Sequence, residues 1–259
     1  MKIFNIYPVK NQKMYKHEDF SMILAHLVEK KLYDPKNFNQ NRYIIMDNGA
    51  YESSRVSTNL RDLITIARSS GIVVDEIVIP DVIGDYEKTK QLFNDNYNIM
   101  KENAQDFNFM YVAHVSNLDQ LKEAIEMVNN EYFKDEVSIT LGIPKHCKIN
   151  RYSKEAIELY KTCYCPIHFL GIKETYEELE CVNGIIRSCD SAQICYIARD
   201  HFNSNYMMNQ KRIGNAINLE NDYIENNKLQ STKDILTKEL LLDGLLWWNS
   251  KRYKMGICT

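Results

Sequence analysis

The sequence is poor in glycine and carries no glycine-rich phosphate-binding motif. Its 9 glycines form neither GxGxxG nor GxxxxGK[ST] after a strand-like run, which leaves dinucleotide-binding and P-loop proteins without support. No apolar run approaches the roughly 18 residues of a membrane-spanning helix. The first residues resemble a strand rather than an export signal. We therefore expect a cytoplasmic protein that has no membrane partner.

Cysteine pairing and a strong basic charge are also missing. The 7 cysteines are scattered and odd in number, which predicts reduced thiols rather than a disulfide framework. The net charge of −3 does not indicate a nucleic-acid partner, so any such site must be a local basic patch. With 44% hydrophobic and 26% charged residues, the chain is typical of a globular protein. Its 259 residues suit a single α/β barrel.

Seven short apolar runs alternate with amphipathic segments of helical length. Such continuous runs are typical of parallel strands that are covered on both faces. The alternation predicts right-handed βαβ units and a (β/α)8 TIM-like barrel, with an open doubly wound sheet as the alternative. The predicted strands span residues 3–9, 43–46, 76–79, 109–114, 137–141, 166–172 and 184–186, and the predicted helices span 19–31, 59–69, 85–102, 118–129, 153–162 and 175–181.

The domain organisation follows from the absence of a linker. We expect one barrel domain over residues 1–259, with a helical extension from about residue 192 to residue 259. In this extension, helices are predicted over 192–202 and 232–249. The apolar segment 240–248 is expected to pack on the barrel exterior or on a partner subunit, which makes a homodimer a further prediction.

Three carboxylates follow predicted strands, where a parallel barrel places its active site. They are Asp47, Asp81 and Asp190, and two glycines, Gly142 and Gly171, lie at other strand ends. A single aspartate at such a position often caps a helix or makes a turn. Three of them favour a functional site, because carboxylates suit attack at an anomeric carbon, proton transfer or recognition of N–H groups on a base. Glycines let a flat ring approach the backbone.

The order of these strand ends resembles the tRNA-guanine transglycosylase superfamily. Asp47-Asn48-Gly49-Ala50-Tyr51 resembles the Asp-Ser-Gly-Gly-Phe signature of that family, and His168-Phe169-Leu170-Gly171-Ile172 resembles its Leu-Met-Gly-Val-Gly strand. The resemblance covers roughly residues 40–192. It implies exchange of guanine for a 7-deazaguanine through a covalent aspartyl-glycosyl intermediate, with no cofactor. Short phage members, which act on DNA, are the most similar, and for such a member the compartment is the host cytoplasm.

The resemblance also implies a role for each site residue. Asp190 is the expected nucleophile, Asp47 the residue that transfers protons, and Asp81 a residue that reads the base edge. Arg187, a cation close to Asp190 in the sequence, is expected to help keep the Asp190 carboxylate ionised. The further substrate-binding residues are Asn48, Gly49, His114, Gly142, Gly171 and Arg187.

The chain departs from the family pattern in several places. Ala50 replaces the second signature glycine, and the base-contacting glutamine is replaced near His114. One strand-like segment precedes Asp47 where the full-length enzymes have two, so a permuted barrel, an incomplete barrel and closure by a C-terminal segment all stay open. No cysteine cluster follows Asp190, so we expect no zinc subdomain.

A short segment before the sixth predicted strand has ligand-like spacing. Cys163, Cys165 and His168 offer three candidate ligands, whereas a closed structural zinc site requires four. Buried thiols and a core or rim histidine are therefore the preferred interpretation. We expect no bound metal.

Two basic segments are candidates for nucleic-acid contact. The first follows the fifth predicted strand, and the second follows the seventh and has interleaved aromatic residues, a combination that can hold phosphates and a splayed base. A solvated helix face explains the same residues equally well. The candidate residues are Lys145, Lys148, Arg151, Arg199, Lys211 and Arg212.

The sequence thus predicts a guanine transglycosylase that acts on DNA in preference to tRNA. Its partners are then a nucleic acid, with the target nucleotide flipped out of any duplex, and a free 7-deazaguanine base. Three alternatives stay open: tRNA base exchange, an N-glycosylase that passes the same intermediate to water, and a non-catalytic barrel that binds a purine or a partner protein.

Overall fold

The computed structural model describes residues 2–7, 9–17, 19–38, 42–50, 59–171 and 181–191. The chain divides into two compact units, one of Met1–Ile6 and Gln12–Ser191 and one of Tyr7–Asn11 and Ala192–Thr259. The first unit carries all the strands described below. The helices expected after residue 192 lie outside the described residues.

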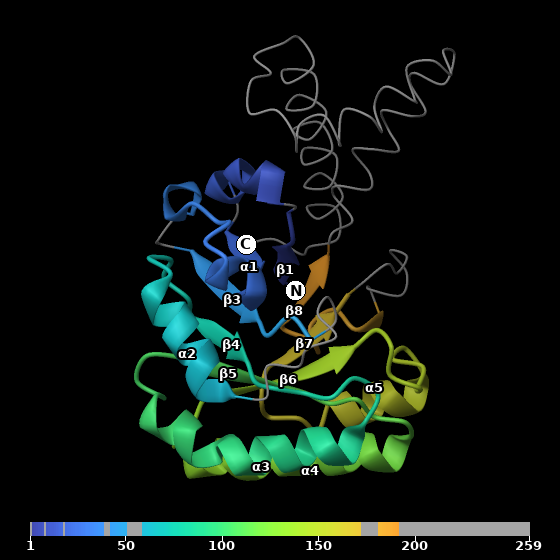
Figure 1. Ribbon diagram of the computed structural model, residues 1–259. Coiled ribbons are helices and arrows are strands. Elements are labelled where there is room, and N and C mark those ends of the chain that lie inside the picture. Colours follow the sequence, from blue (N-terminus) through green and yellow to red (C-terminus); the bar gives the residue numbers. More distant parts are fainter. Residues whose placement is uncertain are drawn as a thin grey trace, which may run out of the picture. The chain divides into compact units, whose positions relative to one another are not determined.

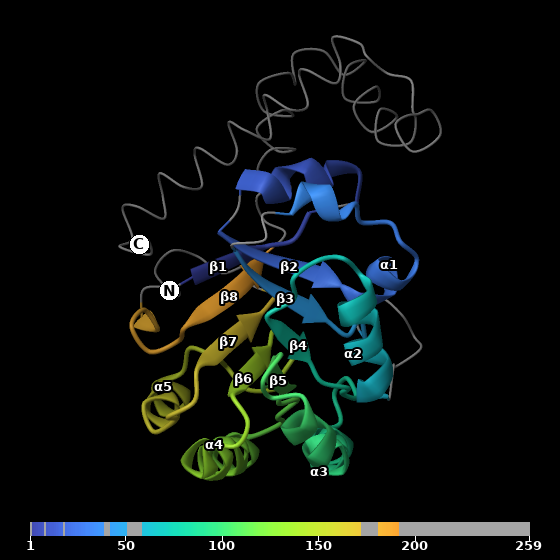
Figure 2. The same ribbon diagram turned by 90° about the vertical axis from the view of Figure 1, so that its left-hand side faces the viewer.

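The described strands form a closed parallel barrel in which each strand pairs with its neighbours in the sequence (Figure 1 and Figure 2). The last strand pairs with the first, Phe4 lying beside Asp190, which completes the ring. The TIM-like fold is therefore confirmed, and the open sheet is excluded. The strands are β1 (Lys2–Asn5), β2 (Phe20–Leu24), β3 (Tyr43–Asp47), β4 (Glu76–Val78), β5 (Asn108–Val112), β6 (Ile139–Pro144), β7 (Ile167–Leu170) and β8 (Ser188–Ser191).

Helices lie on the outside of the strands, as Figure 2 shows for α2 to α5. Four of them start at side-chain caps: Asn59, Asp85, Asn117 and Ser153 each accept a hydrogen bond from a backbone N–H of the first turn. These four helices confirm the predictions over 59–69, 85–102, 118–129 and 153–162, whereas residues 175–180 of the helix predicted over 175–181 lie outside the described residues. The helices are α1 (Ala25–Glu29), α2 (Leu60–Ser69), α3 (Tyr86–Glu102), α4 (Leu118–Lys134) and α5 (Lys154–Tyr160), with short 3-10 helices η1 (Val9–His17) and η2 (Pro35–Asn37).

Two predicted elements were wrong, and both corrections concern barrel closure. The helix expected over residues 19–31 is strand β2 followed by the short helix α1, so two strands precede Asp47. The strand expected over 184–186 is only an isolated bridge between Asn183 and Ile186, and the true strand is β8. Eight strands therefore close the described barrel without a C-terminal segment.

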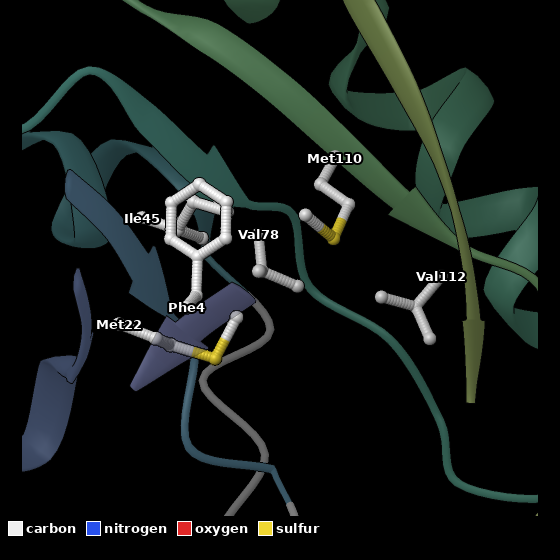
Figure 3. Packing of buried hydrophobic residues seen from close by; sticks show 6 residues of the cluster. All are labelled: Phe4, Met22, Ile45, Val78, Met110 and Val112. Atoms are coloured by element: carbon white, nitrogen blue, oxygen red, sulfur yellow. The ribbon is translucent and has the colours of Figure 1, made fainter. Parts of the chain in front are cut away.

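Apolar side chains from the first five strands fill the barrel interior. Figure 3 shows Phe4, Met22, Ile45, Val78, Met110 and Val112 converging from β1 to β5. On the neighbouring strand β6, Gly142 pairs in register with Val112 and leaves room for this packing. A Cβ atom there would lie 2.9 Å from Leu170 Cδ1 and 3.1 Å from both Met110 and Val112. The interior is therefore a packed core beneath the strand ends.

Within the described residues, no helix combines the length and apolar character needed to cross a bilayer.

Candidate functional site at the carboxyl ends of the strands

The three predicted carboxylates lie at the carboxyl end of the barrel. Asp47 is the last residue of β3, Asp81 follows β4, and Asp190 is the penultimate residue of β8. Asp81 and Asp190 are buried, and Asp47 is half-buried. The side chains that surround them form two separate hydrogen-bonded clusters.

The first cluster consists of Asp81, Asn48 and His114 and joins the ends of β3, β4 and β5. Asn48 Nδ2 donates to Asp81 Oδ1 at 2.8 Å and to the Ile79 carbonyl at 2.8 Å. His114 Nε2 lies 2.5 Å from Asp81 Oδ2. The side-chain oxygen of Asn48, Oδ1, accepts from the Ala50 N–H at 2.8 Å. Asn48 therefore orients Asp81, and Asp81 in turn orients the His114 ring.

Gly49 adopts a conformation that favours glycine and lies against a histidine. Its φ of +75° is in the left-handed region, and a Cβ atom would lie 2.6 Å from His26 Nδ1. The Gly49 N–H donates to Asp47 Oδ1 at 3.2 Å, which holds the aspartate in a turn. Gly49 is thus required by the backbone. His26 Nδ1 is buried with no hydrogen-bond partner in the described part of the chain.

The second cluster surrounds Asp190 and joins β7 to β8. The Gly171 N–H donates to Asp190 Oδ1 at 2.9 Å, and His168 Nε2 lies 3.2 Å from the same oxygen. His168 Nδ1 lies 2.8 Å from Ser188 Oγ, and its ring packs edge-on against Phe4. Gly171 has a φ of +67°, a conformation that turns its N–H toward the carboxylate. Gly171 and His168 therefore both hold Oδ1 of the Asp190 carboxylate.

Arg187 does not lie at this end of the barrel. It precedes β8, and its Nη2 donates to Glu76 Oε2 at 2.9 Å, where Glu76 is the first residue of β4. Tyr43, the first residue of β3, donates to the same oxygen at 2.8 Å. Burial, followed by the charge of Glu76, raises the pKa of Tyr43, so its hydroxyl stays a donor. The structure therefore separates Arg187 from the other predicted substrate-binding residues.

The basic segment after β6 is only partly exposed. Arg151 is 4% exposed, and its Nη1 donates to the carbonyls of Ile143 and Leu170 at 3.1 and 3.0 Å. Its guanidinium also stacks on Phe169. Arg151 therefore joins the ends of β6 and β7 and does not present its charge to a phosphate backbone. Lys148 is exposed and Lys145 half-exposed, whereas Arg199, Lys211 and Arg212 lie outside the described residues.

Gly142 lies beneath the packed side chains of the interior. Its absent Cβ makes room for Leu170, Met110 and Val112 of the chain itself. Gly142 therefore serves packing, and Gly171 is the strand-end glycine whose N–H faces a site residue.

Cys163 and Cys165 carry protonated thiols that donate hydrogen bonds to backbone carbonyls. Cys163 Sγ donates to the Cys165 carbonyl, and Cys165 Sγ donates to the Val128 carbonyl at 3.2 Å. His168 is occupied by Ser188 and Asp190. Among the described residues, no three His, Cys, Asp or Glu side chains are grouped as a metal site. That the protein binds no zinc stays a prediction.

We expect the two thiols to react slowly with alkylating reagents. Burial raises the pKa of Cys163 to about 11 and that of Cys165 to about 12, so both stay protonated at pH 8. Iodoacetamide at pH 8 should modify the exposed Cys181 at least about tenfold faster, as measured by peptide mass spectrometry. In urea the three rates should converge. Equal native rates, or about one zinc per chain by elemental analysis, would contradict this interpretation.

Two residues of the second cluster were missed by the sequence interpretation. The sequence indicates His168 only as a core or rim histidine and does not single out Ser188. The available signal was alternation: Ser188 and Asp190 occupy the same face of a strand, and His168 pairs in register with Ser188. Sequence position alone could not show this, because β8 itself was misplaced.

The fold and site define the protein as a parallel (β/α)8 barrel with two buried aspartate–histidine pairs at the carboxyl ends of its strands. No protein-family model matches the chain, and no curated protein sequence matches it. Its function is therefore argued from the site itself.

Proposed function

We propose that this protein is a guanine transglycosylase that exchanges a guanine in a nucleic acid, DNA in preference to tRNA, for a free 7-deazaguanine base. The observation that carries the proposal is the setting of Asp190. Its carboxylate is buried at the carboxyl end of β8. Oδ1 accepts from Gly171 and lies within hydrogen-bond reach of His168, and the described residues offer no donor to Oδ2. A fixed carboxylate with one oxygen available suits nucleophilic attack.

The reaction has two balanced steps. Asp190 Oδ2 attacks C1′ of the flipped nucleotide, and the C1′–N9 bond breaks with its electron pair passing to guanine. Asp47 gives the leaving guanine a proton. It then takes a proton from N9 of the incoming base, which attacks C1′ and releases the Asp190 carboxylate. No net proton, oxidant or reductant is required.

The Asp81–Asn48–His114 cluster supports recognition of the base. The described hydrogen bonds use both N–H groups and the oxygen of Asn48 within the protein, so Asn48 acts as a positioning residue. Both oxygens of Asp81 also have a protein partner, and His114 is the member that Asp81 holds in a fixed orientation. In this proposal His114 and Asp81 together meet the edge of the base.

The preference for DNA rests on the resemblance to short phage members and on the absence of a cysteine cluster after Asp190 in the sequence. Exposed Lys148 and half-exposed Lys145 are the described basic residues of the first segment that can meet a phosphate.

The test supplies isotopically labelled guanine or 7-deazaguanine to the full chain with separate DNA and tRNA pools. Label recovered in DNA nucleosides supports the proposal, whereas label in tRNA alone overturns the choice of DNA. Loss of guanine without incorporation would indicate an N-glycosylase. Binding of the free base with intact polymers would indicate a non-catalytic barrel.

Replacement of Asp47 by asparagine should abolish proton transfer while preserving the turn. The amide oxygen can still accept from Gly49 N–H, so the melting temperature should change little. The exchange rate should fall roughly 10²–10⁴-fold. A wild-type rate in Asp47→Asn, measured with the labelled base, would remove Asp47 from the mechanism.

A further inference from the structure

A chain of hydrogen-bonding groups runs inside the barrel from its amino end to Asp190. Arg187 donates from Nη2 to Glu76 Oε2 at 2.9 Å and from Nε to Ser188 Oγ at 3.1 Å. Ser188 Oγ lies 2.8 Å from His168 Nδ1, and His168 Nε2 lies 3.2 Å from Asp190 Oδ1. Glu76, His168 and Ser188 are all 0% exposed. This series of hydrogen bonds therefore links the Arg187–Glu76 ion pair at one end of the barrel to the proposed nucleophile, Asp190, at the other.

The direction of each bond follows from what its groups can donate. Arg187 is a donor only, so Ser188 Oγ accepts its Nε–H. The Ser188 hydroxyl has one hydrogen, and His168 Nδ1 is its acceptor among the described residues. An ionised Asp190 is an acceptor only. His168 must therefore accept at Nδ1 and donate from Nε2.

The other protonation states of His168 conflict with these neighbours. A hydrogen on Nδ1 would leave the Ser188 hydroxyl hydrogen without an acceptor among the described residues. Removing the hydrogen from Nε2 would place its lone pair against those of Asp190 Oδ1. An imidazolium has the first fault, because its Nδ1–H would also face the Ser188 hydroxyl. The neutral Nε2–H form is the one that matches Ser188 Oγ on one side and Asp190 Oδ1 on the other.

We propose that Arg187, Ser188 and His168 are positioning residues for Asp190 and that they act as one unit. The unit fixes the Nε2–H tautomer of His168, and this donor, together with the Gly171 N–H, holds Asp190 Oδ1 so that Oδ2 meets C1′. The proposal rests on the proposed function for its catalytic consequence but not for the tautomer. Arg187 thus affects the site from the opposite end of the barrel without touching substrate.

The test replaces Ser188, which connects Arg187 to His168. In wild type, histidine 15N NMR of the full chain should show the Nε2–H pattern for His168, with the resonances assigned by their absence in His168→Gln. In Ser188→Ala, His168 Nδ1 loses its donor while Nε2 still faces Asp190, so the Nδ1 signal should move from its wild-type position. The rate of covalent adduct formation should fall at least about tenfold, while the Kd of the free base stays unchanged. Ser188→Thr, which keeps the hydroxyl and suits a strand, should restore both readouts.

A matched control is Ser21→Ala, since Ser21 is a buried serine of β2 on the face opposite Met22. This variant should keep the wild-type tautomer and rate. An unmoved His168 Nδ1 signal in Ser188→Ala would overturn the proposed unit, and a moved signal with an unchanged rate would overturn its positioning role. If wild type forms no adduct, the proposed function fails, and the NMR result still decides whether the unit fixes the tautomer.

Discussion

Replacement of Asp190 by alanine is expected to abolish base exchange, lowering the single-turnover rate by at least about a thousandfold. The variant lacks the atom that forms the bond to C1′. It should still bind the free base, because recognition is assigned to Asp81, His114 and the end of β3. The measurements are release of guanine from the nucleic acid and equilibrium binding of the labelled base.

Two further variants make this result interpretable. Asp190→Asn keeps an oxygen that accepts from Gly171 and His168, so it should fold like wild type. It should lose exchange as well, because an amide is a poor nucleophile. Asp95→Asn alters an exposed aspartate of α3 and should leave the rate unchanged. Exchange by Asp190→Ala would show that the nucleophile is elsewhere, with Asp81 the next candidate.

Replacement of Arg187 by methionine is expected to lower the free energy of unfolding by about 3–5 kcal/mol. Glu76 is 0% exposed, and Arg187 is the cation that pairs with it among the described residues. The second oxygen of Glu76, Oε1, is buried without a partner among the described residues. Removing Arg187 leaves a buried carboxylate with the Tyr43 hydroxyl and no countercharge. Urea unfolding at pH 7 measures the difference.

The matched control is Arg61→Met, which breaks the exposed pair between Arg61 and Glu102. Exposed pairs contribute little, so this change should cost less than about 1 kcal/mol. The double variant Glu76→Gln/Arg187→Met should recover part of the loss, because it removes the unpaired charge. Equal effects of Arg187→Met and Arg61→Met would contradict the buried ion pair.

The sequence predicted much of the fold because strands β3 to β7 are continuous apolar runs. It failed at β2, where Phe20–Leu24 continues without a break into the apolar residues of α1, so the whole segment fits a helical period. It failed again at β8, whose sequence Ser-Cys-Asp-Ser is polar. That strand is polar because its inward face carries the site residues Ser188 and Asp190.

Position after a predicted strand was sufficient to place Asp47, Asp81 and Asp190 at the carboxyl end of the barrel. The partners of these residues could not be predicted, because they depend on strand register. Arg187 and Asp190 are neighbours in sequence, yet three residues along a strand span about 10 Å and place them at different levels of the barrel. His168 is 22 residues from Asp190 and bonds to it directly. Arg151 likewise reads as a surface cation, although the ends of β6 and β7 enclose it.

The most direct measurement is to locate the sugar on the protein. The full chain is incubated with guanine-containing DNA without an incoming base, denatured in acid, digested with nuclease and protease, and analysed by peptide mass spectrometry. The account predicts one modified peptide, the one that contains Asp190, with the mass of a base-free deoxyribosyl group, and its disappearance when labelled 7-deazaguanine is added before denaturation. A modification on Asp47 or Asp81, or base exchange that proceeds with no modified peptide, would contradict it.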